Sequence, residues 1–200
     1  MLFLAACDSQ QTSEEELSLD GLGTAGVEIT TPFSSSSTTE NGGTVSTKVR
    51  LKSAPLSPVT ITLNSSDTQE GTVSPTVLTF NKDNWDSYVS IIVTGVDDDI
   101  ADGSQSYEIQ IASVVSEDSK YSALNGQINP IKLQNEDDEI KAIVLGSLSG
   151  DTTEAGGNAT FSVKLASKPI EAVSIPIIST DTSEGTISVS SLSFDNSNYN

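Results

Sequence analysis

The sequence contains no histidine and only one cysteine, Cys7, among its 200 residues. The absence of histidine removes the usual general base, the partner that activates a serine or cysteine nucleophile, and a common zinc ligand. A single cysteine excludes an intrachain disulfide. Aromatic residues make up only 5% of the chain, which disfavours a carboxylate-based glycosidase, because such enzymes need aromatic sugar platforms in a cleft. The composition therefore favours a protein that is not an enzyme.

Basic residues are also scarce, with nine Lys and Arg against 28 Asp and Glu and a formal net charge of −19. A surface this acidic repels phosphate backbones, so the chain is not expected to have a nucleic acid partner. Two interpretations of the carboxylates stay open. They form a solvated shell that keeps the protein soluble, or they bind a hard cation such as calcium, which prefers carboxylate oxygens.

What the chain does contain is a series of short segments in which apolar and polar residues alternate, separated by turn residues such as Asn, Asp and Gly. Alternation at period two predicts half-buried β-strands. About seven strands are expected, which is the number typical of an immunoglobulin-like antiparallel β-sandwich, and this is the predicted fold class. The expected strands are residues 27–31, 45–51, 59–63, 73–80, 89–93, 107–111 and 131–133. Pro75 interrupts the third long strand, which should therefore be bent or lie at a sheet edge.

The sequence repeats itself without a gap: residues 38–85 align with residues 152–199 at an offset of 114. A match of this length indicates a duplicated domain. Residues 26–139 are expected to form one complete repeat and residues 140–200 a truncated second repeat, which has no counterpart of residues 86–139. The matched pairs include Glu40/Glu154, Gly71/Gly185, Leu51/Leu165, Val59/Val173, Ile61/Ile175 and Phe80/Phe194. Trp85 and Tyr199 also correspond, and either cap the core or form an aromatic binding platform.

The N-terminal residues Leu4-Ala5-Ala6-Cys7 resemble the lipobox of bacterial lipoproteins. The resemblance implies that residues 1–7 are part of a lipoprotein signal and that a lipid on Cys7 anchors the protein to a membrane in the bacterial cell envelope, at the surface or in the periplasm. Residues 8–25 are polar, acidic and glycine-containing, as expected of a flexible tether. The alternative is that Cys7 is an incidental free or buried thiol.

Acidic residues gather in loops that an alternating sandwich places at one end of the first repeat. These loops precede the strand at 45–51, follow the strands at 59–63 and 89–93, and leave the last strand. So many like charges in one place are costly unless they are solvated or neutralised. The acidic residues in these loops are Glu40, Asp67, Glu70, Asp97, Asp98, Asp99, Asp102, Glu136, Asp137, Asp138 and Glu139.

The segment Gly95-Val96-Asp97-Asp98-Asp99-Ile100-Ala101-Asp102, followed by Tyr107-Glu108-Ile109-Gln110-Ile111 and by the closing cluster Asn135-Glu136-Asp137-Asp138-Glu139, resembles the Calx-beta family. The resemblance implies a β-sandwich that binds calcium. The ligands that it implies are Glu40, Asp97, Asp98, Asp102, Asp137 and Asp138.

The first repeat departs from the family pattern in two places. Gly103, Ser104 and Gln105 stand where the family often continues its acidic loop, and Asn135 and Glu136 break an all-aspartate ending. The second repeat keeps the equivalent of Glu40, but it has no counterpart of the acidic loop or of the closing cluster, so no complete second site is expected.

These features lead to two hypotheses about function. The first is a non-catalytic structural or adhesion module of the cell surface, stiffened by calcium at the joint between the repeats, with an extracellular protein or carbohydrate as its ligand. The alternative is a spacer or carbohydrate-binding support for a catalytic domain encoded beyond the C-terminus.

Overall fold

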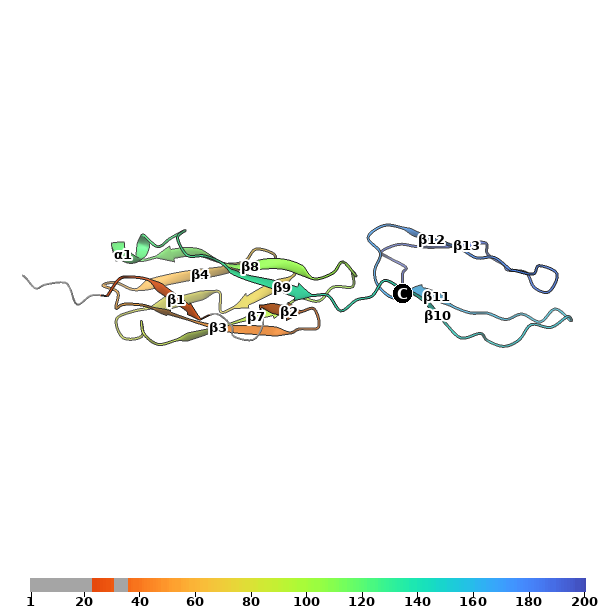
Figure 1. The fold of residues 1–200 in the computed structure, drawn as a ribbon, viewed down its shortest axis with the longest axis horizontal. Coiled ribbons are helices and arrows are strands. Elements are labelled where there is room, and N and C mark those ends of the chain that lie inside the picture. The colour runs from red at the N-terminus through yellow and green to blue at the C-terminus, as the bar shows by residue number, and fades with distance from the viewer. Residues whose placement is uncertain (1–22, 31–35) are drawn as a thin grey trace, which may run out of the picture.

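The computed structural model describes residues 23–30 and 36–200, which form an elongated molecule with one complete sandwich followed by a more open part (Figure 1). Cys7 and most of the expected tether lie outside the described residues. Within the described residues, no helix reaches the length and apolar character that a membrane span requires.

Nine strands between residues 26 and 139 form two facing sheets (Figure 1). The four-stranded sheet has the order β1 (Val27–Thr30), β3 (Thr44–Leu51), β7 (Val89–Gly95) and β5 (Gly71–Ser74). The five-stranded sheet has the order β2 (Ser37–Thr39), β9 (Ile131–Glu136), β8 (Gln105–Val115), β4 (Val59–Ser65) and β6 (Val77–Phe80). The predicted all-β, immunoglobulin-like sandwich is confirmed.

The core lies between these two sheets and is almost entirely aliphatic. Alternate residues of each strand face inward, because successive side chains of a strand point to opposite faces. Leu51 of β3 and Ile61 of β4, one from each sheet, are both fully buried, as is Phe80 of β6. Trp85 is partly buried and packs against the same core, which favours the capping role over a binding platform for this side chain.

Two details of the predicted strand pattern are wrong. The strand expected at residues 73–80 is two strands in different sheets: β5 pairs with β7, whereas β6, after Pro75, pairs with β4. The fold is also not wholly antiparallel, since β2 pairs in parallel with β9. The Ser-Thr-Thr sequence of β2 has no apolar alternation, so nothing in it signalled a strand.

A short helix, α1 (Ser119–Ser122), closes the end of the first sandwich opposite the acidic loops (Figure 1). Asp118 caps it by accepting a hydrogen bond from Lys120 N at 3.0 Å, and its second oxygen accepts one from Leu56 N at 2.8 Å. Tyr121 of the helix is 1% exposed and extends the core. Its hydroxyl donates to the carbonyl oxygen of Ser53 at 2.5 Å, which fixes the helix to the segment that follows β3.

The second repeat forms two separate two-stranded sheets (Figure 1). The sheets pair β10 (Ile143–Leu145) with β11 (Val163–Leu165), and β12 (Val173–Pro176) with β13 (Ser191–Phe194). β12 and β13 have the register of β4 and β6, since Val173 lies opposite Phe194 as Val59 lies opposite Phe80. The 114-residue offset therefore holds for backbone pairing as well as for sequence.

Candidate cation site at the acidic end of the first repeat

The acidic end is assembled where strands of both sheets finish. The backbone N–H of Glu40, which directly follows β2, donates to the carbonyl oxygen of Glu136 at the end of β9, at 3.0 Å. Gly95 N, at the end of β7, donates to Gly43 O at 3.0 Å, and Val96 N donates to Glu70 O at 3.1 Å. These bonds bring the loop after β2, the loop before β5, the loop after β7 and the exit from β9 together, as the alternating strand directions predict.

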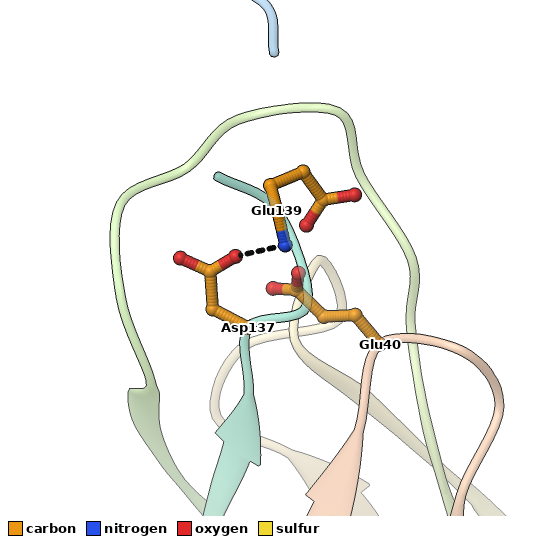
Figure 2. Close-up of side chains that lie close together, drawn as sticks. All are labelled: Glu40, Asp137 and Glu139. Atoms are coloured by element: carbon orange, nitrogen blue, oxygen red, sulfur yellow. Dashed lines mark hydrogen bonds between the residues drawn. The ribbon is translucent and has the colours of Figure 1, made fainter. Parts of the chain in front are cut away.

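Glu40 is the centre of this arrangement. Glu40 is only 2% exposed, and one of its oxygens, Oε2, accepts no hydrogen bond from an N–H or hydroxyl group of the described residues. One carboxylate oxygen from each of Glu40, Asp137 and Glu139 lies within 4.8 Å of the other two. Figure 2 shows the three side chains turned toward one another, with the backbone N–H of Glu139 donating to Asp137 Oδ1 at 2.8 Å.

The crowding and burial of these carboxyl groups shift their pKa values. Burial raises the pKa of Glu40 to about 8, assisted by a hydrogen bond to Glu139 and by the charges of Glu139, Asp137 and Asp98. Burial also raises the pKa of Glu139. Burial opposes ionisation of Asp137 too, but hydrogen bonds from the backbone of Glu139 and Gly103 outweigh it and hold the pKa of Asp137 below its usual value. At neutral pH and without a cation, Glu40 therefore keeps its proton while Asp137 is ionised.

A second carboxylate group lies beside the first and shares one residue with it. Asp97, Asp138 and Glu139 each place an oxygen within 4.8 Å of the other two. Glu139 was not among the ligands that the sequence implied, although it belongs to the closing cluster. Glu139 belongs to both groups, and its buried Oε2 accepts no hydrogen bond from an N–H or hydroxyl group of the described residues.

The structure thus brings together four of the six residues that the sequence singled out, Glu40, Asp97, Asp137 and Asp138. The other two face different surroundings. Asp98 Oδ1 accepts a hydrogen bond from Ile100 N at 2.6 Å and so stabilises its own loop. Asp102 is exposed and lies on the side of Glu70. In the described part of the chain neither residue joins a carboxylate group as close as those two.

A network of buried polar side chains lies between the acidic end and the core of the first repeat. Asn135 of β9 is fully buried, and its amide donates to the carbonyl oxygen of Val96 at 2.8 Å and accepts from Thr38 Oγ1 at 2.9 Å. The Thr38 hydroxyl also lies 2.8 Å from the hydroxyl of Tyr107. A buried amide can donate and accept at once, which an aspartate could not do. The asparagine that breaks the family's acidic ending is therefore a structural residue that ties β2, β9 and the acidic loop together.

The acidic loop also contacts the second repeat. The carbonyl oxygen of Asp99 accepts a hydrogen bond from Lys168 N at 2.7 Å. Burial and a hydrogen bond with Asp99 raise the pKa of Tyr199, which is partly buried. Ala101 in the same loop is 6% exposed. Since Glu139 is followed directly by the first residue of the second repeat, both carboxylate groups lie at the joint between the repeats.

Comparison with known proteins gives no family. No protein-family model and no curated protein matches the sequence. Among solved structures, the chain is similar to WR4, an MSP family member from C. elegans, with a TM-score of 0.34 and 10% identity over 55% of this chain and 95% of that one. It is also similar to SSP-19, an MSP-domain protein-like family member from Caenorhabditis elegans, with a TM-score of 0.31 and 10% identity over 51% of this chain and 92% of that one. At these TM-scores the similarity assigns neither a family nor a function.

Proposed function

We propose that this chain is a non-catalytic structural module of the cell surface, of the Calx-beta type, in which calcium bound at the acidic end of the first repeat stiffens the joint with the second. The observation that carries the proposal is Glu40. Its buried carboxyl group faces those of Asp137 and Glu139, and ionising all three together is costly unless a cation held jointly by them neutralises the charge.

The donor set suits calcium better than other common ions. All candidate ligands are carboxylate oxygens, which hard cations prefer, whereas zinc prefers histidine and cysteine; the sequence has no histidine, and residues 23–30 and 36–200 contain no cysteine. Calcium accepts six to eight oxygens in flexible geometry, so carboxylates from separate loops can combine with backbone carbonyls and water. The ligands that we propose are Glu40, Asp137 and Glu139 in one group, and Asp97 and Asp138, with Glu139 shared, in the other.

The position of the site supports a mechanical role. Glu139 precedes the second repeat without a linker, and the loop that carries Asp97 also makes the backbone contact from Asp99 to Lys168. An ion that cross-links the loop to the exit of β9 would restrict rotation at the joint. A lipid on Cys7 would then hold this stiffened pair at the envelope, where it would present a surface to an extracellular protein or carbohydrate.

Calorimetry with calcium tests the proposal directly. Calcium should bind the wild-type chain and, at about 100 times its dissociation constant, stabilise the first repeat by about 2.7 kcal/mol. Glu40→Gln should lose most of this heat and stabilisation. Glu154→Gln is the matched control, because Glu154 is the exposed equivalent of Glu40 in the second repeat, and this variant should bind like the wild type.

Small-angle scattering tests the stiffening separately. Calcium should narrow the distribution of distances between the repeats, and a chelator should widen it again. Absence of calcium binding, or binding that Glu40→Gln leaves unchanged, contradicts the proposed site. If calcium binds but the scattering is the same in calcium and in chelator, the mechanical role is contradicted while the proposed binding site is still supported.

A further inference from the structure

Basic residues of the first repeat gather on the outward face of one strand, although the chain as a whole is strongly acidic. Lys48 and Arg50 of β3 and Lys52, which directly follows it, stand at alternate positions, and Val49 and Leu51 between them are buried. Because alternate side chains of a strand share a face, the three basic side chains point away from the core. One face thus holds three of the nine basic residues of the chain.

Arg50 holds an exposed tyrosine on this face. The guanidinium carbon of Arg50 lies 4.5 Å from the centre of the Tyr88 ring, in a cation–π contact. Glu28 of β1 links the two side chains, since its Oε1 accepts from the Tyr88 hydroxyl at 2.7 Å and its Oε2 accepts from Arg50 Nε at 3.0 Å and Nη2 at 2.9 Å. The hydrogen bonds from Tyr88 and Arg50 hold the pKa of Glu28 below its usual value, so this carboxylate is ionised at neutral pH. Tyr88 is thus held in place, but it is still 41% exposed.

Two lysines flank this ring along the strand. Lys48 pairs with Ser90, the second residue after Tyr88, and Lys52 N donates to the carbonyl oxygen of Gly26 at 2.9 Å. Among the described residues, neither lysine forms an ion pair with a carboxylate. At the rise of a β-strand their Cα atoms are about 13–14 Å apart. The face therefore offers a rigid aromatic ring between two ammonium groups that no described carboxylate pairs with.

The internal repeat shows that the strand pairing does not need this cluster. At the offset of 114, Lys48 and Lys52 correspond to Ser162 and Ala166. The strand beside them carries Val144 at the register position of the glutamate. β11 nevertheless pairs with β10 in antiparallel fashion, as β3 pairs with β1. The cluster is therefore a property of the first repeat rather than a requirement of the fold.

The acidity of the rest of the protein does not prevent an anionic ligand from binding here. The acidic end lies beside Gly43, and at the rise of a strand Lys48 and Lys52 are about 17 and 30 Å further along the chain. At physiological salt, exposed charges more than about 8 Å apart are largely screened. Asp86 adds one negative charge near Arg50, which is fewer than the two lysines supply. An approaching anion therefore meets the local positive charge rather than the net charge of the chain.

We propose that this outward face of β1, β3 and β7 binds an acidic polysaccharide, with a sugar ring packed on Tyr88 and sugar carboxylates paired with Lys48 and Lys52. Both charge and shape favour this ligand. Carboxylates complement the two ammonium groups, and the exposed ring offers apolar surface with little loss of side-chain freedom, because Arg50 and Glu28 already hold it. A linear anionic chain that follows β3 meets both lysines. Such binding would give the proposed surface module its partner, so the inference rests on that part of the proposed function but not on calcium.

Titration of the intact chain with polygalacturonate tests the proposal, with dextran as the neutral control and polyglutamate as an acidic polymer without sugar rings. A chelator keeps calcium from cross-linking the polymer or filling the cation site. The chain should bind polygalacturonate, fail to bind dextran, and bind polyglutamate at least about tenfold more weakly, because that polymer has no ring to pack on the tyrosine.

Four variants locate the binding surface. Tyr88→Ala should weaken polygalacturonate binding by at least about tenfold, as truncation of an aromatic anchor does, whereas Tyr88→Phe keeps the ring and should retain most of the affinity. Lys48→Ser combined with Lys52→Ala, which installs the residues of the second repeat, should weaken binding to a similar extent. All three positions are exposed, so the variants should fold. Lys132→Ala removes an exposed lysine from the other sheet and should bind like the wild type.

Any of three results overturns the proposal. The first is absence of polygalacturonate binding in the chelator. The second is equal affinity for polyglutamate, because the surface would then recognise charge without sugar. The third is an affinity that Tyr88→Ala or the double lysine variant leaves unchanged. Calcium binding at the acidic end is measured separately, so failure here does not affect the proposed cation site, and failure there does not affect this surface.

Discussion

Replacing Glu40 by glutamine should remove most of the pH dependence of stability that the acidic end imposes on the metal-free protein. Glutamine has nearly the same shape as protonated glutamic acid and can still donate to Glu139, but it has no proton to lose. In the wild type the proton is retained because Glu40 is buried, hydrogen-bonds Glu139 and lies in the field of the charges of Glu139, Asp137 and Asp98. The variant therefore isolates the cost of ionising this one carboxylate.

The magnitude follows from the difference in pKa. The pKa of Glu40 is about 8 in the folded protein, against 4.5 for an ordinary glutamate. Because the folded state binds the proton more tightly, its stabilisation is fully present below pH 4.5 and is lost as the pH rises through about 8. At about 1.4 kcal/mol per pH unit, the free energy of unfolding should fall by about 5 kcal/mol across this window. Glu40→Gln should match the wild type at the acidic limit and exceed it at the alkaline one.

The assay is urea unfolding with a chelator present, followed by the fluorescence of Trp85, the single tryptophan, which packs against the first core. Measurements between about pH 4 and 9 span the expected transition. Glu154→Gln should follow the wild-type curve. Parallel curves for the wild type and Glu40→Gln over the whole range would refute the reasoning, because Glu40 would then be ionised at no cost.

Two further pairs of variants use the internal repeat as its own control, with the first repeat again monitored by tryptophan fluorescence in urea. Gly71→Ala should destabilise the first repeat by about 1–3 kcal/mol, because a Cβ at Gly71 collides with the ring of buried Tyr107. A Cβ at Gly185 would have nothing within 4 Å, so Gly185→Ala should leave the unfolding curve unchanged. Ile61→Ala should cost about 2–5 kcal/mol through the cavity that it leaves, whereas Ile175→Ala in the open second repeat should change this signal by less than about 0.5 kcal/mol. Equal effects within either pair would contradict the packing described.

The sequence predicted the parts of the fold that depend on local pattern. Alternation located the central strands, and their directions placed the acidic loops at one end. It could not assign β5 and β6 to different sheets, since that choice depends on distant pairing: Val73 pairs with Val93, whereas Leu78 pairs with Ile61. Strand β2 was missed because its stability comes from its partner β9 rather than from its own residues.

The candidate site was predictable to the level of loops but not of individual ligands. Which carboxylate of an acidic loop turns inward depends on the backbone path, so Asp98 binds its own loop and Glu139 takes the bridging position. The raised pKa of Glu40 could not be expected either, because burial of a loop residue depends on how neighbouring loops cover it. Asn135 had a signal in the sequence, as a departure from an acidic ending, but its meaning required the contacts with Thr38 and Val96.

The pairing of β2 with β9 has a consequence for folding kinetics. Thr38 and Asn135 are 97 residues apart along the chain, so closing this contact carries a large loop entropy and is expected late in folding. Interactions absent from the transition state slow unfolding without accelerating folding. A cation held between the residues that follow these two strands would therefore act mainly on the lifetime of the folded repeat. The acidic end would confer kinetic stability, the property that limits proteolysis and forced unfolding when these depend on the unfolding rate.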